Sequence, residues 1–173
     1  MNIAMDLKNH LQILSRYHYW AMDHLYLHLN GVSEDDYRKD SGLFFKSIHR
    51  TLNHLLVVDE LWLARFIEAR SPVIALDTEI ESDREKLRRR LEEETRKWEV
   101  FIKNPKPFPD LLEYTTMRGF QTKIPFSIAL AHVFNHGTHH RGQIIAAMTT
   151  AGYSSPEIDL VYMLQALPAE HDE

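Results

Sequence analysis

The sequence predicts an all-α protein: an up-down four-helix bundle with a short β-hairpin between the third and fourth helices and a short C-terminal helix. Three observations support this prediction. Long segments repeat apolar residues at helical spacing, turn and proline signals separate these segments, and one stretch alternates apolar and polar residues as strands do. We expect residues 1–173 to form a single domain, because this length suffices to bury a core.

The first two helices are marked by the spacing of their leucines and by their boundary residues. The first is expected over about Ala4–Leu29, and Asn30–Gly31 ends it. The second is expected over about Leu43–Ala69, with Ser41 as its N-cap. Because this second segment is apolar almost all round, we expect it to be buried among its neighbours.

The third helix and the hairpin come next. The third helix is capped near Thr78 or Ser82 and runs to about Lys103, where the motif NPKPFP forbids its continuation. Within residues 111–124, apolar and polar residues alternate on both sides of Arg118–Gly119, a pair that can form a turn. This pattern predicts a short β-hairpin.

The last two helices complete the chain. Pro125 is a favourable first-turn residue, and the fourth helix is expected from there to near Gly152. A short final helix is expected over about Pro156–Leu167. With no linker or low-complexity segment between them, four long helices predict an antiparallel bundle.

The composition is that of a soluble globular protein, with 44% apolar and 26% charged residues. The chain has no cysteine, which excludes disulfides, thiolate nucleophiles and cysteine-ligated metal sites. The start, MNIAMDLKNH, does not have the pattern of a signal peptide, and the longest aliphatic run, LLVV at 55–58, is too short to span a membrane. We therefore expect a cytoplasmic protein with no membrane partner.

The charge pattern argues against nucleic-acid binding. The net charge is −5, so a broad phosphate-binding surface would need a local basic patch. The best candidate, REKLRRR at 84–90, continues into LEEETRK, and acidic and basic residues recur there at i,i+4 spacing. We interpret this segment as a self-neutralised, solvated helix face.

The motif HVFNHGTHHRGQI at 132–144 places four histidines within nine positions. On a helix, His136 and His140 border the buried stripe, whereas His132 and His139 point further away from it. The i,i+4 pair of His136 and His140 is the geometry by which one helix presents two imidazoles to a metal ion.

A stable metal site needs a third protein ligand, and the second helix offers two candidates. His54 lies among large apolar residues, whereas His49 is expected in a more solvated position. Each histidine alone, including His18 in the apolar stripe of the first helix, could instead be a hydrogen-bonded packing residue. Three buried imidazoles are most simply satisfied by one cation, so we predict a divalent-metal site at His54, His136 and His140.

Five segments carry a resemblance to a known family: YHYWAMDHL, SIHRTLNHLLVVDELWLARF, YTTMRGFQTKIP, HVFNHGTHHRGQI and YSSPEIDLVYML. Together they resemble the DinB family of metal-binding four-helix bundles, also called the YfiT-like family, over nearly the whole chain. The resemblance implies a three-histidine site at His54, His136 and His140, with nickel or zinc as the typical metal and water completing its shell.

The resemblance also implies an activity. Some similar proteins are metal-dependent transferases or isomerases that use a low-molecular-weight thiol such as bacillithiol or mycothiol. We therefore expect a small-molecule substrate and thiol S-transfer, with hydrolysis as another reaction open to such a metal. Two alternatives stay open: a non-catalytic metal-binding stress protein and a metal-free helical interaction module.

Further polar residues are candidates for catalysis or for orienting the imidazoles. They are His18, Asp59, Tyr114 and Gln143. Arg141 falls among apolar neighbours on its helix, so we expect it to pair with a carboxylate from another helix or from a second subunit.

We also expect a homodimer formed through helices, with the first or the fourth long helix contributing. Four large aromatic residues supply more apolar surface than one small bundle needs to bury: Trp20, Trp62, Phe44 and Phe45. The alternative is that the hairpin and the last helix cover these residues. Similar family members are often dimers.

Overall fold

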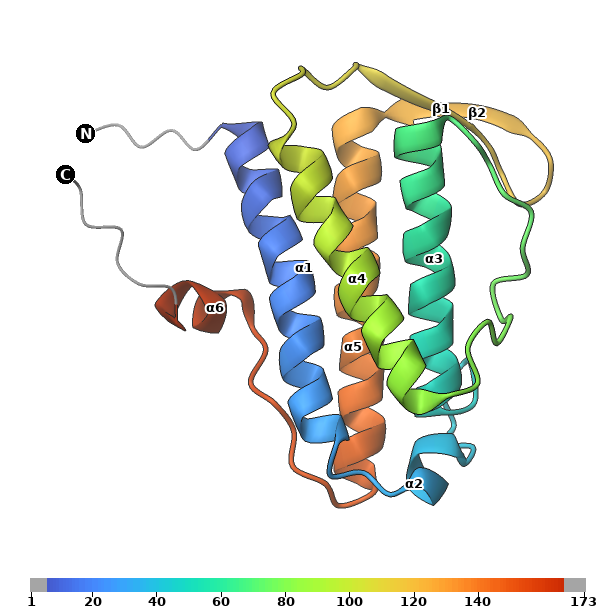
Figure 1. Cartoon of the computed structure of the whole chain (residues 1–173), viewed down its shortest axis with the longest axis vertical. Helices are drawn as coiled ribbons and strands as arrows, with labels where there is room; N and C mark the ends of the chain where they lie inside the picture. The colour runs from blue at the N-terminus through green and yellow to red at the C-terminus, as the bar shows by residue number, and fades with distance from the viewer. Residues whose placement is uncertain (1–5, 167–173) are drawn as a thin grey trace.

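The computed structural model describes residues 6–166 and shows a bundle of four long helices with a hairpin across one end (Figure 1). The long helices are α1 (Leu7–Leu29), α3 (Ile48–Glu68), α4 (Arg84–Lys103) and α5 (Phe126–Thr150). The shorter elements are α2 (Glu34–Arg38), β1 (Leu111–Thr115), β2 (Gln121–Pro125) and α6 (Leu160–Ala166). The predicted mainly-α fold with one antiparallel hairpin is confirmed.

The direction of α4 differs from that expected for a strict up-down alternation of the four long helices. Helices α1 and α3 each pack against both α4 and α5, so consecutive long helices are not always neighbours. Contacts between α3 and α4 advance together along both helices, from Glu60 with Arg90 to Phe66 with Phe101, which makes these two helices parallel. The reason is the connection 69–83, which returns along the bundle to the end where α3 begins (Figure 1).

The start of α3 lies later than expected. Its N-cap is Ser47, whose hydroxyl accepts from the Arg50 amide, and not Ser41. The residues before it form a tight turn, with positive φ at Gly42 (73°) and Lys46 (74°), so the helix cannot include Leu43. The short α2 was missed because five residues are too few to show a helical period.

The remaining boundaries agree within a few residues. Helix α4 is capped by Asp83 and not by Thr78 or Ser82, and α6 begins at Leu160 and not at Pro156. The expected start at Ala4 and the expected end at Leu167 lie outside the described residues. In the hairpin, Gly119 has the positive φ (83°) that the predicted turn requires.

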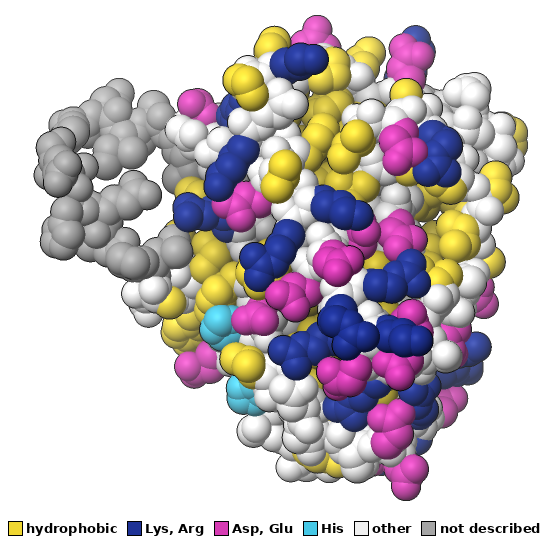
Figure 2. All heavy atoms as spheres, viewed as in Figure 1, with side chains coloured by type: hydrophobic (Ala, Val, Ile, Leu, Met, Phe, Trp, Pro, Cys, Tyr) yellow, Lys and Arg dark blue, Asp and Glu magenta, His cyan; other side chains and the backbone are white. Residues whose placement is uncertain are grey.

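Charged side chains of both signs alternate over the exposed face of α4, as Figure 2 shows. Glu92 and Arg96 form one of the predicted i,i+4 pairs at 3.1 Å on the side of α4 next to α1, and Glu94 pairs with Lys97 on the side next to α3. Charges of both signs are therefore paired on α4, but Glu92–Arg96 is the one predicted i,i+4 pair within 4 Å between residues 84 and 97. Between residues 6 and 166, no helix has the length and apolar character needed to cross a membrane.

Candidate metal centre

Three histidines from two helices converge on one point inside the bundle. The Nε2 atom of His136 lies 3.2 Å from that of His54 and 3.1 Å from that of His140. His54 and His140 are 3% and 6% exposed, and one nitrogen from each of the three residues lies within 4.8 Å of the others. The structure therefore brings together the three residues predicted as metal ligands.

The orientation of His54 is fixed by the backbone of the 69–83 connection. Its Nδ1 lies 2.8 Å from the carbonyl oxygen of Leu76. A carbonyl can only accept, so Nδ1 carries the proton and Nε2 presents its lone pair to His136 and His140. Such a backbone partner for the second ring nitrogen is typical of metal-binding histidines.

The orientation of His140 depends on a side chain that the sequence predicts. Its Nδ1 lies 2.8 Å from Oε1 of Gln143, and the Gln143 amide nitrogen lies 3.1 Å from Nε2 of the exposed His139. Since the amide oxygen only accepts, the Nε2 lone pair of His140 faces the centre. Gln143 therefore contacts one predicted ligand, whereas His139 lies behind it.

The electrostatics keep these rings neutral. Burial, reinforced by the neighbouring imidazoles, lowers the pKa of His136 to about 3 and that of His140 to about 4. Burial also lowers the pKa of His54. Neutral imidazole is the form that binds metals, so each of the three rings can offer one nitrogen lone pair to a divalent cation between them.

An aromatic side chain that the sequence analysis did not connect with the site covers one ligand. The Phe45 ring stacks on His54 with centroids 3.9 Å apart, and it lies 5.7 Å from the His140 ring. Phe45 is in the turn before α3, not in the helix as expected. No sequence pattern indicated this contact, because it depends on the positive φ of Lys46.

Removal of the hydrogen bond between Gln143 and His140 tests whether Gln143 orients this predicted metal ligand. The Gln143→Ala variant is expected to bind nickel or zinc about tenfold more weakly, because the His140 ring loses the group that fixes its tautomer. Isothermal titration with each metal measures the change. Unaltered affinity would show that Gln143 does not orient His140.

Two other candidates, His18 and Asp59, meet each other in a buried cluster. The His18 Nε2 lies 3.2 Å from an Asp59 carboxylate oxygen, and the same oxygen accepts from the Trp98 indole at 3.0 Å. On its other side, His18 Nδ1 lies 3.3 Å from a guanidinium nitrogen of Arg141. The four residues come one from each long helix, and we name them the junction cluster.

The protonation of the junction cluster follows from its donors. The Arg141 guanidinium can only donate, so His18 accepts at Nδ1 and donates from Nε2 to Asp59. Arg141 thus reaches a carboxylate from another helix through His18, whereas a direct pair was expected. Here His18 and Asp59 contact each other and not the three converging imidazoles.

The junction cluster leaves no room beside α5. A Cβ atom on Gly137 would lie 2.5 Å from Cε1 of His18 and 2.9 Å from a guanidinium nitrogen of Arg141. The His18 ring is held on both sides and cannot give way. By contrast, nothing lies within 4 Å of a Cβ on Gly142, five residues along the same helix.

These two glycines provide a matched pair of stability measurements. Gly137→Ala is expected to reduce the free energy of unfolding by about 1–3 kcal/mol through overpacking. Gly142→Ala is expected to raise it by up to about 1 kcal/mol, because alanine favours helix. Urea denaturation of both variants measures the difference, and equal effects would rule out the close approach of His18 to α5.

The other sequence candidates lie elsewhere. Tyr114 packs edge-to-face against Trp62 on the hairpin side, with ring centroids 5.3 Å apart. His132 is exposed, and the centroid of its ring lies 5.4 Å from that of the Trp62 ring. His49, expected in a solvated position, is 1% exposed, so that expectation was wrong.

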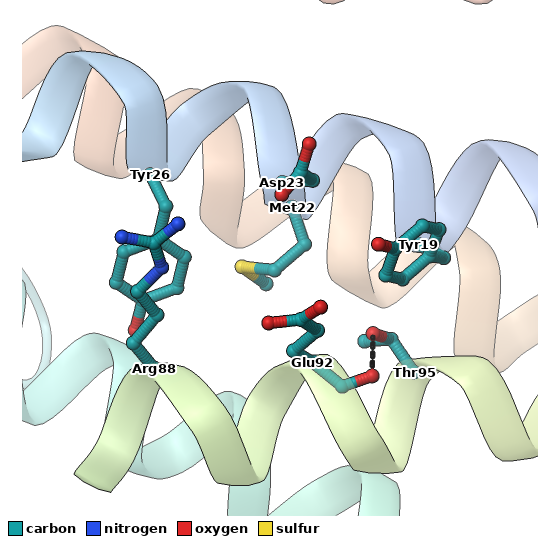
Figure 3. Close-up of a pocket in the computed structure, with 7 residues that line it drawn as sticks. All are labelled: Tyr19, Met22, Asp23, Tyr26, Arg88, Glu92 and Thr95. Atoms are coloured by element: carbon teal, nitrogen blue, oxygen red, sulfur yellow. Dashed lines mark hydrogen bonds between the residues drawn. The ribbon is translucent and has the colours of Figure 1, made fainter. Parts of the chain in front are cut away.

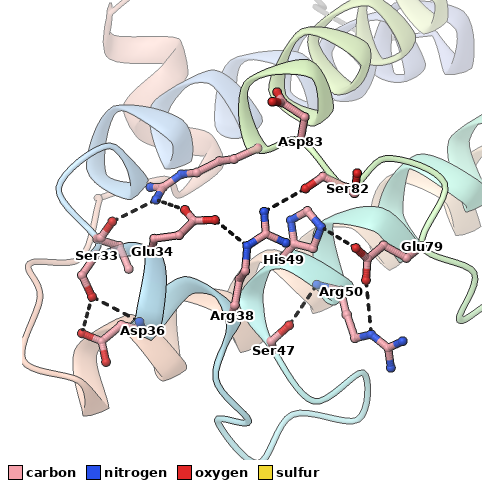
Figure 4. A network of polar contacts seen from close by, with 12 residues as sticks. Ser33, Glu34, Asp36, Arg38, Ser47, His49, Arg50, Glu79, Ser82 and Asp83 are labelled. Carbon is pink, nitrogen blue, oxygen red and sulfur yellow. Dashed lines mark hydrogen bonds and ion pairs between the residues drawn. The ribbon is translucent and has the colours of Figure 1, made fainter.

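His49 belongs to a polar network where α2, α3 and the start of α4 meet (Figure 4). Its Nε2 lies 3.3 Å from Glu79, which also pairs with Arg50 at 3.6 Å. Arg38 donates to the Ser82 carbonyl in the same network. The connection 69–83 supplies Glu79, so the helical period alone could not show that His49 is buried.

A small pocket between α1 and α4 is distinct from the histidine cluster (Figure 3). It is lined by Tyr19, Met22, Asp23, Tyr26, Arg88, Glu92 and Thr95. None of these residues was predicted as a ligand or catalytic group. The candidate functional site is the three-histidine centre, where three possible ligand atoms lie within 4.8 Å of one another.

Comparisons with known proteins give a match to a family and to a relative. The model of the DinB family matches residues 5–172. The chain is also similar to Protein DinB of Bacillus subtilis (strain 168), with 28% identity over 155 residues, 84% of this chain and 88% of that protein. No solved structure matches the chain.

Proposed function

The chain belongs to the DinB family, and on that basis we propose that it is a divalent-metal-dependent transferase or isomerase that acts with a low-molecular-weight thiol. The observation that supports this proposal most is the convergence of three neutral imidazoles, from His54, His136 and His140. Nickel or zinc is the proposed metal, since imidazole ligands suit both ions.

Three protein ligands leave coordination positions open, as catalytic sites do and structural sites do not. A divalent ion held there would lower the pKa of a thiol or water that reaches it. The chain's own contributions are the tautomers set by Leu76 and Gln143 and the apolar cover of Phe45 over His54.

The activity is tested with monochlorobimane as the electrophile and bacillithiol, mycothiol and glutathione as thiols. In each transfer the thiol sulfur bonds to carbon, the carbon–chlorine bond breaks, and chloride and the thiol proton are released. We expect transfer with at least one thiol, lost on chelation and in His54→Ala. Metal binding without transfer would favour the non-catalytic metal-binding protein, and no metal binding would favour the metal-free module.

We also propose a homodimer through α1 or α5. Of the aromatic residues that suggested it, Phe45 and Trp62 are buried within the chain and Trp20 is half-buried against the α6 segment, whereas Phe44 is 81% exposed. Leu27 on α1 and Ile128 on α5 are also exposed and add apolar surface. Light scattering at micromolar concentration is expected to give twice the chain mass of 20.4 kDa, and a single chain mass would exclude the dimer.

A further inference from the structure

Arg65, near the end of α3, is a buried cation that lacks a carboxylate partner among residues 6–166. It is 5% exposed, and its guanidinium lies 4.6 Å from the Trp62 ring and 4.3 Å from the Tyr114 ring. Its one hydrogen bond within the described chain is to the Thr115 carbonyl, at 3.3 Å, and its Nε has no partner there. Burying a charge in this way is costly unless an anion compensates it.

The aromatic contacts leave N–H donors of the Arg65 guanidinium available for another partner. A guanidinium has five N–H donors, and the contacts of the Arg65 Cζ with the Trp62 and Tyr114 rings provide no hydrogen-bond acceptor oxygen to them. A planar carboxylate binds the edge of a guanidinium through two parallel hydrogen bonds. The aromatic contacts would therefore hold Arg65 in place for this partner without competing with it.

Arg65 lies on the same side of α3 as the metal ligand His54. The two residues are eleven positions apart, which on a helix is three turns plus about 20° and an axial distance of about 16 Å. Side chains on a helix lean toward its N-terminus, and the contact with Trp62 shows that Arg65 does so. The guanidinium therefore lies between Trp62, one turn earlier in α3, and the hairpin residues Tyr114 and Thr115.

A continuous series of ring contacts joins Arg65 to that centre. The Trp62 ring, in contact with Arg65, lies 5.4 Å from the His132 ring, which lies 5.8 Å from the His136 ring. His132 is exposed and His136 is half-buried, so this series comes to the surface between α3 and α5. A small molecule along it would have one end at the centre and the other at Arg65.

We propose that Arg65 is an anion-binding residue that selects substrates with a carboxylate at the end remote from the reacting group. The inference rests on the proposed function, because the other end of the molecule is taken to reach the metal. Arg65 is a specificity-determining residue in this account, and it takes no part in bond making.

The test compares thiols that differ only in their remote end. Cobalt(II)-loaded protein is titrated with 8-mercaptooctanoate and with 8-mercaptooctanol, and thiolate binding is followed by the sulfur-to-cobalt absorption band. We expect the acid to bind about tenfold more tightly or better, the advantage of one charge-assisted bond pair. The short 3-mercaptopropionate, which cannot reach Arg65, should show no advantage over 2-mercaptoethanol.

Two variants assign the advantage to Arg65. Arg65→Met keeps the apolar stem and removes the charge, so the acid and the alcohol should bind equally. Arg70→Met, at an exposed arginine just beyond the same helix, should keep the wild-type preference. Equal binding of acid and alcohol by the wild-type protein would overturn the inference while leaving the thiol-dependent function intact, even if Arg65→Met failed to fold.

A second measurement does not depend on thiol chemistry. Octanoate is titrated into metal-free protein, and the Nε–H resonance of Arg65, assigned by its absence in Arg65→Lys, is followed by NMR. A saturable shift in this resonance would support the anion-binding role even if no thiol bound the cobalt, which would count against the proposed function alone. An unshifted resonance would overturn the inference.

Discussion

Replacement of His54, His136 or His140 by alanine is expected to lower the affinity for nickel or zinc by more than about a hundredfold. This loss is larger than the loss expected when a ligand keeps its place but loses a hydrogen bond, as His140 does in Gln143→Ala. Each change removes one of three ring nitrogens that lie within 4.8 Å of one another, and two imidazoles make a weak site. Elemental analysis and metal titration of protein without a histidine tag measure the loss.

The matched control is the double variant His132→Ala/His139→Ala. Both side chains belong to the same motif but are exposed, and the three-nitrogen cluster does not include them. This variant should keep the metal affinity within a few-fold. Full metal occupancy in His136→Ala or His140→Ala, or a loss in the double variant as large as in His54→Ala, would contradict the assignment.

The histidines of the centre were predictable because helical geometry is local. Spacing of four residues places His136 and His140 on one face, and their relation to the apolar stripe favoured them over His132 and His139. Burial of His54 followed from its apolar neighbours in the same helix. Convergence of the two helices was the one non-local step, and the family resemblance agreed with it.

What the sequence did not show comes from contacts between distant segments. The Leu76 carbonyl that orients His54 is a backbone group, and any residue at that position would supply it. The parallel direction of α3 and α4 depends on where a long connection runs, and no local pattern encodes that route. His49 was placed wrongly for the same reason, since Glu79 in this connection encloses it.

The turn before α3 shows a different kind of limit. The apolar residues from Leu43 onward fit a helical period, so the pattern favoured an earlier helix start. Ser47 competes as an N-cap, and the positive φ of Gly42 and Lys46 stops the helix there. Ser41 and Ser47, six residues apart, are both plausible N-caps, and helix propensity alone cannot rank them. The choice between them decides whether Phe45 lies in the turn, where it covers His54.

The largest loss of stability is expected from Asp59→Ala, about 3–5 kcal/mol in the free energy of unfolding. Asp59 is 2% exposed and accepts hydrogen bonds from His18 and Trp98, and through His18 it balances the charge of the fully buried Arg141. Without the carboxylate, two donors and one guanidinium stay buried without their counterpart. Urea denaturation in the presence of a chelator measures the loss free of any contribution from bound metal.

Two further variants separate charge from shape. Asp59→Asn keeps the size of the side chain and an oxygen that can accept from Trp98, so a large loss in this variant would come from the uncompensated charge of Arg141. Asp35→Ala, at an exposed carboxylate in α2, should change the stability by no more than about 0.5 kcal/mol. If Asp59→Asn were as stable as the wild-type protein, the Asp59 charge would not be needed to balance Arg141, and the junction cluster would hold the four helices by packing alone.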